Sequence, residues 1–265
     1  MGLLKLTGVA TTSVHGREDV RGFFDRCACA YAEQHGHAGR LLEYRLGLVR
    51  AHARLMAEDD VLDVGCGPGD HLLALASQIR HGTGVDLSPG MIDVASARLR
   101  GSPNAGHVTF AVDDASELAS VPTASVDVVL CIGVLEHVLD KPATLASIRR
   151  TLRAGGRFFC LTPNGDYLWY RHIAPRLGLA TRHLSTDSFL TRDGLVAMLR
   201  RAGFGRVEAG PWTFVPKGDM PRVAGWTLMA LDLVGRATGV RSLRGGLWTC
   251  AWAGPGAAAD SEPEL

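Results

Sequence analysis

Short apolar runs alternate along the chain with longer segments in which apolar residues recur at every third or fourth position. The runs typical of strands are Val61–Val64, Thr83–Asp86, His107–Val112, Val126–Ile132, Gly156–Leu161, Arg206–Val215 and Gly246–Ala253. The segments typical of helices are Asp70–Arg80, Pro89–Arg100, Pro142–Leu152 and Arg192–Ala202. Strands and helices that alternate at this spacing predict βαβ units. We therefore expect an α/β fold, a doubly wound and mostly parallel seven-stranded sheet with helices on both faces.

Two regions flank this pattern. Residues 1–57 are predicted to form an N-terminal helical cap region, and residues 58–256 the main domain. The main domain carries two insertions, an aromatic one at about 163–190 and one at about 217–245 that contains an apolar helical stretch, Val223–Ala237. The low-complexity residues 257–265 are expected to form a flexible tail.

Composition excludes several classes of protein. Among the 265 residues, Lys and Arg number 28 and Asp and Glu 27, so the chain lacks the basic excess of a dedicated nucleic-acid binder. A hydrophobic share of 46% excludes a mostly disordered chain. The six cysteines are scattered, without the paired spacing of a disulfide or zinc framework, which favours reduced thiols and a cytoplasmic location. No signal peptide or membrane span is expected.

A glycine-rich turn follows the first predicted strand, in the sequence Val61-Leu-Asp-Val-Gly-Cys-Gly-Pro-Gly-Asp70. Such a turn between a strand and a helix lets the backbone approach a nucleotide closely. A dinucleotide site requires Gly or Ala where Asp70 stands, because a carboxylate there repels pyrophosphate by about 1 kcal/mol or more. Asp63 would suit a cationic ammonium group. The turn therefore favours an adenosyl ligand that lacks phosphates.

Acidic residues follow the next two strands as well. Asp86 lies 21 residues after Gly65, the offset expected of an acid that binds ribose hydroxyls. Asp114 follows the third strand, where it could meet an adenine amino group. The alternative is that these residues are loop acids and helix caps.

With these motifs in place, the sequence resembles the class I S-adenosylmethionine-dependent methyltransferases, over about residues 20–210. The motifs that carry the resemblance are LDVGCGPG (62–69), GVDLSPGMI (84–92), VDDASEL (112–118), VDVVLCIGVLEHV (126–138) and LRAGGRFFCLTPN (152–164). The resemblance implies a Rossmann-like fold and S-adenosylmethionine as cofactor, with S-adenosylhomocysteine as product. The spacing is most similar to that of quinone O-methyltransferases, whose cofactor-contacting arginine precedes the first glycine by twenty residues, as Arg45 does here.

The cofactor site implied by the motifs and the resemblance draws on residues along much of the chain. Its members are Tyr31, Arg45, Asp63, Gly65, Cys66, Gly67, Asp86, Leu87, Met91, Asp113, Asp114, Ala115, Ile132 and His137.

Two motifs of related families are missing. Quinone O-methyltransferases carry Glu-x-x-Glu-His after the fourth strand, implicated in metal binding, whereas Gly133 here precedes Glu136 and His137. A hard divalent ion needs several oxygen ligands, so we expect no required metal. The Asn/Asp-Pro-Pro-Tyr/Phe motif of enzymes that methylate amino groups of nucleic acids or proteins is also absent. Its absence argues against those substrates.

Two histidines are candidate catalytic residues. His137 either borders the cofactor pocket at a helix start or acts directly in catalysis, and His183 either acts as a general base or has a structural role. Tyr167, Trp169, Tyr170 and His183 are candidates for substrate binding, although the tyrosines and Trp169 could equally belong to the core.

Three functions remain open. The first is methyl transfer to an oxygen or carbon of a small, fairly hydrophobic metabolite in specialised biosynthesis. The second is a methyltransferase of quinone or isoprenoid-lipid biosynthesis, and the third a cofactor-binding protein or cyclase that transfers no methyl group. We expect a monomer or homodimer with a small-molecule substrate, no nucleic acid and no stable membrane association. The Val223–Ala237 stretch is either a lid over the substrate or a packed helix. A membrane-surface role is not favoured, because two flanking arginines are few for such a helix.

Overall fold

A computed structural model describes residues 11–30, 38–103, 105–176, 178, 181–212 and 222–254. Within them, seven strands form one sheet in the order β3-β2-β1-β4-β5-β7-β6. The strands are β1 (Asp60–Val64), β2 (His81–Asp86), β3 (Val108–Val112), β4 (Val126–Ile132), β5 (Leu152–Pro163), β6 (Phe204–Trp212) and β7 (Gly246–Ala253). The helices are α1 (Arg17–Cys27), η1 (Ala28–Ala30), α3 (Ala38–His52), α4 (Asp70–Leu75), η2 (Ala76–Gln78), α5 (Pro89–Arg100), α6 (Lys141–Thr151), η3 (Trp169–Ile173), α7 (Ala174–Arg176), α8 (Arg192–Arg201), α9 (Arg222–Thr238) and η4 (Arg241–Leu243).

The sheet confirms the predicted doubly wound architecture. Strands β3, β2, β1, β4 and β5 pair in parallel, and β7 is antiparallel to both of its neighbours, so the sheet is mixed. The chain winds from β1 towards β3 and then returns to the other side of β1 with β4. Ligands of such sheets bind beyond the carboxyl ends of the strands at this switch point, here between β1 and β4.

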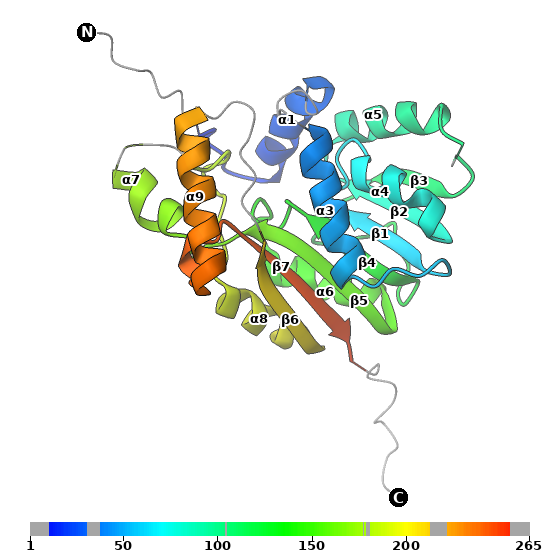
Figure 1. Cartoon of the computed structure of the whole chain (residues 1–265). Coiled ribbons are helices and arrows are strands. Elements are labelled where there is room, and N and C mark those ends of the chain that lie inside the picture. Colours follow the sequence, from blue (N-terminus) through cyan, green and yellow to red (C-terminus); the bar gives the residue numbers. More distant parts are fainter. Residues whose placement is uncertain are drawn as a thin grey trace, which may run out of the picture.

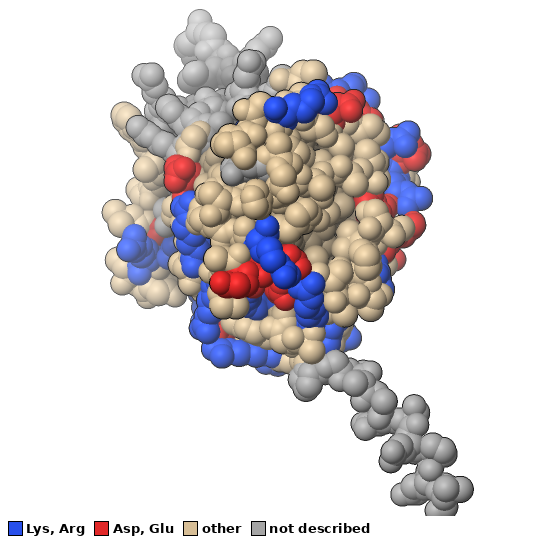
Figure 2. All heavy atoms as spheres, turned by 90° about the vertical axis from the view of Figure 1, so that its right-hand side faces the viewer, with Lys and Arg blue, Asp and Glu red and all other residues tan. Residues whose placement is uncertain are grey.

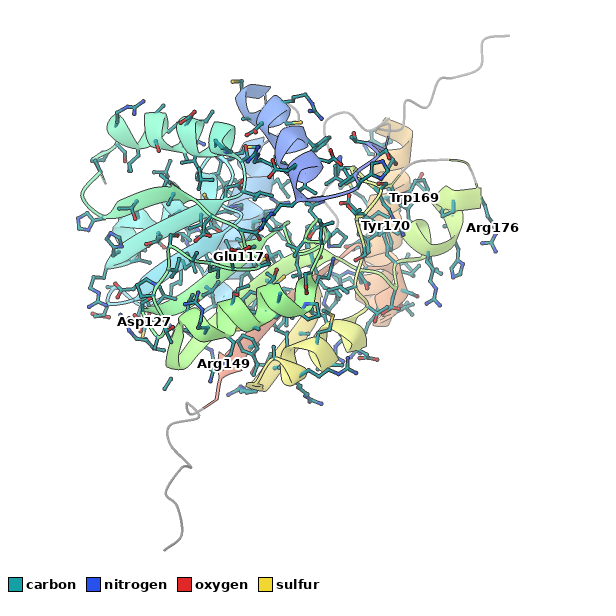
Figure 3. The ribbon with its side chains drawn as sticks, turned by 180° about the vertical axis from the view of Figure 1, so that it is seen from behind. Glu117, Asp127, Arg149, Trp169, Tyr170 and Arg176 are labelled. Carbon is teal, nitrogen blue, oxygen red and sulfur yellow. The ribbon has the colours of Figure 1, made fainter. Side chains whose placement is uncertain are left out.

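Helices cover both faces of the sheet (Figures 1 and 3). One hydrophobic core joins α3 and α4 to the sheet through Leu46, Val49 and Leu72. The other joins α6 and α8 to the opposite face through Leu145 and Leu199. Successive strand residues serve alternate cores because side chains along a strand point to opposite faces.

The N-terminal region divides into two parts with different packing. Helix α3 belongs to the sheet core, whereas α1 lies at the carboxyl edge of the sheet beside α5 (Figure 1). The Asp25 carboxylate of α1 accepts hydrogen bonds from Ser88 Oγ at 2.5 Å and from the Gly90 N–H at 3.0 Å. The hydrogen bond from Ser88 holds the pKa of Asp25 below its usual value. These bonds fix α1 against the start of α5.

The second insertion forms helix α9, which lies on the outside of the molecule (Figure 1). A buried ion pair between Asp232 Oδ1 and Arg244 Nε, at 3.0 Å, ties it to the segment that precedes β7. The expected tail, 257–265, lies outside the described residues.

Charges of both signs are interspersed on the face shown in Figure 2. At the amino ends of β1 and β4, Arg153 pairs with Asp60 at 2.9 Å and with Asp127 at 2.6 Å, and Arg80 also pairs with Asp60. Among the described residues, no helix is long and apolar enough to cross a membrane.

Candidate active site

The glycine-rich loop between β1 and α4 adopts a backbone that side chains tolerate poorly. Gly65, Gly67 and Gly69 have φ angles of 68°, 53° and 79°, in the left-handed region that favours glycine. A Cβ atom at Gly65 would lie 2.4 Å from a methyl group of Val134, and one at Gly69 would lie 2.7 Å from the Phe110 ring. A Cβ atom at Gly67 would meet nothing within 4 Å. The loop is therefore closed behind Gly65 and Gly69 and open in front of Gly67.

Asp63 is a buried carboxylate at the end of β1. Its side chain is 1% exposed, and Oδ2 has no hydrogen-bond partner among the described residues. Burial, together with the nearby charges of Asp86 and Asp70, raises the pKa of Asp63 to about 8. An acid in this state is ready to receive a cation, because the cation would offset both the burial and the like charges.

Asp86 closes the other side of the glycine loop. Its Oδ2 accepts from the Gly67 N–H at 2.9 Å, and its Oδ1 accepts from the Ser88 N–H at 2.9 Å. Burial raises the pKa of Asp86. Ser88 also caps α5 by accepting from the Met91 N–H at 3.1 Å, and Met91 is 1% exposed. These bonds link the ends of β1 and β2.

Asp113 and Asp114 follow β3, and both carboxylates take part in local bonds. Asp113 accepts from the N–H groups of Asp114 and Ser120, both at 2.8 Å. Asp114 Oδ1 accepts from the N–H of Ser116, and Oδ2 pairs with Arg17 of α1 at 2.6 Å. Burial raises the pKa of Asp114, but the bonds from Arg17 and Ser116 outweigh it and hold the pKa below its usual value. The structure thus assigns Asp114 a contact with α1, and its contact with adenine stays a prediction.

Arg45 of α3 lies at the same edge. A Cβ atom at Gly133, just after β4, would be 3.7 Å from a guanidinium nitrogen of Arg45 and 3.9 Å from a carboxylate oxygen of Glu136. Arg45 also lies near His71 of α4. Burial and then the Arg45 charge lower the pKa of His71 to about 3, so this imidazole is neutral at physiological pH. Its Nε2 is buried and has no hydrogen-bond partner among the described residues.

The remaining predicted cofactor residues line the surrounding framework. Cys66 is buried with Sγ against β2, Ile132 ends β4, and Leu87 and Ala115 pack against neighbouring hydrophobic clusters. Burial keeps the pKa of the Cys66 thiol well above its usual value. Tyr31 lies outside the described residues.

His137 forms a close pair with Asp187, which the sequence did not single out. The distance from His137 Nδ1 to Asp187 Oδ1 is 2.7 Å, and Asp187 Oδ2 accepts from the N–H groups of His183 and Leu184, both at 2.9 Å. Burial raises the pKa of Asp187, but the bonds from His137 and the two N–H groups outweigh it and hold the pKa low. An ionised carboxylate can only accept, so Nδ1 carries a proton, and Nε2 is an acceptor whenever the ring is neutral.

Three elements enclose this imidazole. The His137 ring makes edge contacts with Phe24 of α1 at a centroid distance of 5.4 Å and with His183 at 6.2 Å. The His183 segment is held by the N-terminal segment, since Thr12 N–H donates to the His183 carbonyl and Ser185 N–H donates to the Thr12 carbonyl, both at 2.8 Å. The structure thus brings both candidate histidines together.

The predicted aromatic cluster is only partly accessible. Tyr167 is fully buried and packs edge-on against Tyr170, whose ring lies 4.7 Å from that of Phe189. Burial and the nearby Glu136 raise the pKa of Tyr170 to about 12. Figure 3 places Trp169 and Tyr170 on the same side of the molecule as α9, with Arg176 pointing outward. Tyr167 is therefore a core residue, whereas Trp169 and Tyr170 are partly exposed.

Glu136 is buried next to His137, and its Oε2 accepts from Thr162 Oγ1 at 3.2 Å. Among the described residues, no group of three or more His, Cys, Asp or Glu side chains could hold a metal ion.

A glycine loop at the switch point of a sheet with this strand order defines a Rossmann-like nucleotide-binding protein. A family model described as "Methyltransferase domain" matches residues 62–160. The chain is 32% identical to the ubiquinone biosynthesis O-methyltransferase of Xanthomonas oryzae pv. oryzae, over 69% of this chain and 77% of the relative. The chain therefore belongs to the class I S-adenosylmethionine-dependent methyltransferases, and S-adenosylmethionine is its cofactor.

Two further comparisons support the family and the fold respectively. The demethylmenaquinone methyltransferase of Symbiobacterium thermophilum is 35% identical, over 68% of this chain and 73% of the relative. The crystal structure of the [4+2]-cyclase SpnF superposes with a TM-score of 0.67 at 20% identity, over 94% of this chain and 99% of that one. The second likeness shows the fold alone.

The sequence pattern does not mark four residues of this site: Phe24, Asp25, His71 and Asp187. Asp25 and Phe24 lie in a predicted helix, where nothing in the pattern tells which residue faces the site. Asp187 follows a Ser-Thr pair in a segment without periodicity. Its distance of 50 residues from His137 means that only the tertiary structure reveals their contact.

Proposed function

We propose that the chain transfers the methyl group of S-adenosylmethionine to a hydroxyl oxygen of a small, fairly hydrophobic acceptor, with His137 as the general base. The observation that carries this proposal is the His137–Asp187 pair at the carboxyl edge of the sheet. A base at this position is useful for an oxygen acceptor, whose proton must leave as the bond to carbon forms. We therefore favour oxygen over carbon.

The described residues fit the cofactor. The orphaned Oδ2 of Asp63 is suited to its ammonium group, Arg45 to its carboxylate, and Asp86 to its ribose hydroxyls. The space in front of Gly67 leaves room for close approach to the loop. The remaining predicted residues, including Met91, Asp113, Asp114 and Ile132, would surround the adenine. When bound, the cofactor supplies an electrophilic methyl group on a sulfonium.

The role of the chain is to align the acceptor and to take its proton. His137 would accept the hydroxyl proton at Nε2 while Asp187 stabilises the imidazolium that forms. A methyl ether, S-adenosylhomocysteine and a proton are the products. His183 and Phe24 would limit the movement of the ring by their edge contacts, and Tyr170 would border the acceptor.

The pathway class from which the acceptor comes is a second, more specific part of the proposal. The similarity to ubiquinone and menaquinone methyltransferases supports the quinone alternative, whereas the role in specialised biosynthesis rests on the sequence alone. The proposal requires of either acceptor only a hydroxyl group and an apolar body. The cyclase alternative is supported by a likeness of fold only.

The test is methyl transfer from radiolabelled S-adenosylmethionine to a panel of short-chain quinols, catechols and simple phenols. We expect labelled ether product with a member of the panel, and a loss of about 10²–10⁴-fold in the single-turnover rate of His137→Ala. A matched control is His172→Ala, which removes an exposed histidine. A His137→Ala variant that keeps the full rate would exclude His137 as the base.

A further inference from the structure

Helix α9 buries an acidic residue and exposes several large apolar ones. Its inward positions include Leu228 and Asp232, which are 1% and 2% exposed, and Gly235, which packs against η4. Its outward stripe is apolar, and the exposed large side chains on or flanking it are Trp226, Met229, Leu233 and Val234. Trp226 is 71% exposed and Leu233 66%. A helix that exposes this much contiguous apolar surface marks an interaction site.

The buried ion pair fixes which side of α9 faces outward. Asp232 and Arg244 satisfy each other's charge at 3.0 Å inside the molecule. Rotating the helix to bury Trp226 and Leu233 would expose and separate this pair. Gly235 also faces inward and is closely packed, because a Cβ atom there would lie 2.7 Å from Leu243. The apolar stripe therefore stays on the surface.

Within α9 and the segment that follows it to the end of β7, the exposed charges of the described side chains are all positive. Asp232 is the only acidic residue in the sequence between positions 222 and 254, and it is buried. Arg236 at the flank of the stripe and Arg241 in η4 are exposed. An exposed apolar face with Trp and Leu, bordered by arginines, suits contact with a membrane interface.

We infer that α9 docks on an anionic lipid surface, with Trp226, Met229 and Leu233 inserted among the lipids and Arg236 and Arg241 beside their phosphates. A second copy of the chain suits the surface less well. In a two-fold dimer the same patch faces itself. The arginines would then meet one another with no exposed acid of α9 or η4 to pair with them. Anionic lipid supplies the negative charge that the stripe lacks.

The docked helix would lie next to the acceptor side of the site. Asn164 Nδ2 donates to the carbonyls of Arg244 at 2.8 Å and Arg241 at 3.2 Å, and Asn164 leads directly into the segment that carries Tyr170. A lipophilic acceptor could thus pass between the bilayer and the site. This inference differs from the expectation of no stable membrane association, because the sequence alone does not show which face of the helix is exposed.

Vesicle co-sedimentation tests the inference without any methyl transfer, so its outcome is separate from that of the proposed function. The full chain is mixed with vesicles of phosphatidylcholine and phosphatidylglycerol in equal parts, and with vesicles of phosphatidylcholine alone. We expect binding to the anionic vesicles that weakens as salt is added, and a Trp226→Glu/Leu233→Glu variant that binds roughly tenfold or more weakly. Arg236→Glu/Arg241→Glu should lose the preference for anionic lipid.

The matched control is Met56→Glu, since Met56 is 52% exposed and precedes β1, at the opposite edge of the sheet. It should bind as the unchanged chain does. Circular dichroism verifies that each variant folds. Absence of binding by the unchanged chain, or undiminished binding by Trp226→Glu/Leu233→Glu, overturns the inference. So does a dimer in size-exclusion chromatography that the same variant separates into monomers, because α9 would then be covered by a second copy.

Discussion

Asp187 holds His137 through Nδ1 at 2.7 Å, while its second oxygen accepts from the backbone of His183 and Leu184. One buried carboxylate thereby fixes the tautomer of one histidine and the position of the segment that carries the other. The pair resembles the histidine and carboxylate of a nucleophilic triad in its logic, but it contains no nucleophile and would act on a substrate hydroxyl.

Replacement of Asp187 by Asn should lower the rate of methyl transfer by about 10- to 1,000-fold, because the imidazolium loses its negative partner. KM for S-adenosylmethionine should change little. The measurement is single-turnover transfer as a function of pH. The apparent pKa of the base, read from the acidic limb of the pH profile, should be lower in Asp187→Asn. A lower melting temperature of the same variant, with an unchanged pH profile of the transfer rate, would indicate that Asp187 is purely structural.

The free energy of unfolding should fall as pH rises from about 4 to about 8 because of Asp63. The pKa of Asp63 is about 8 in the folded chain and about 3.9 in an unfolded one. The folded chain therefore binds more protons across this interval, and stability declines with pH. Urea unfolding at several pH values should show this slope in the unliganded chain, and Asp63→Asn should flatten it. An equal slope in both proteins would contradict the assignment.

Cofactor binding should release a proton near neutral pH if Asp63 receives the ammonium group. The cation favours the ionised carboxylate, so its pKa should drop on binding. Calorimetry in two buffers of different ionisation enthalpy measures the proton count. The release should be absent from Asp63→Asn, and its persistence there would assign the proton to another group.

Asp86→Ala should weaken cofactor binding by roughly tenfold or more, because the substitution removes the proposed ribose acceptor and the bond to the Gly67 N–H. Isothermal calorimetry measures the affinity. Asp127→Asn provides the control, since Asp127 is a partly buried acid at the opposite edge of the sheet. Unchanged affinity in Asp86→Ala would exclude the ribose contact.

Two glycines of one loop should respond differently to alanine. Gly69→Ala places Cβ 2.7 Å from the Phe110 ring, so the variant should lose roughly 1–3 kcal/mol of stability by overpacking, in addition to backbone strain. Gly67→Ala meets no atom, so its stability loss should be limited to the backbone strain of about 1–2 kcal/mol. The free energy of cofactor binding should be weakened by more than the free energy of unfolding. The added methyl group would project into the open space in front of the loop, where the cofactor is proposed to approach. Urea unfolding and calorimetry on the two variants compare these effects.

Asp232→Ala should destabilise the region of α9 by about 3–5 kcal/mol, since it leaves the Arg244 guanidinium buried without its partner. Hydrogen exchange of α9 amides measures the local loss. The double change Asp232→Leu/Arg244→Met should recover most of it. Exchange of α9 amides in Asp232→Ala equal to that in the unchanged chain would mean that the pair does not anchor α9.

The sequence was sufficient for the framework because the signals involved are local. Strands β4 and β7 and helix α5 begin and end at the predicted residues, since short apolar runs, a Ser cap and Pro at the start of a helix act over a few positions. The helix predicted over Asp70–Arg80 differs in the structure: the α-helix ends at Leu75 and a 3-10 turn continues to Gln78. Periodicity does not distinguish these two helical forms.

The sequence alone determined which groups follow each strand. A glycine loop follows β1 and acids follow β2 and β3, at one edge of one sheet. The tertiary structure decided which side chains meet. The pairing of His137 with Asp187 and of Asp232 with Arg244 joins residues 50 and 12 positions apart, and neither separation is one that a helix or strand period brings together. The same folding leaves Trp226 and Leu233 of α9 exposed, while Asp232 of the same helix is buried in its ion pair with Arg244. Hydrophobicity along the chain states how much apolar surface exists, and only packing determines which part of it is covered.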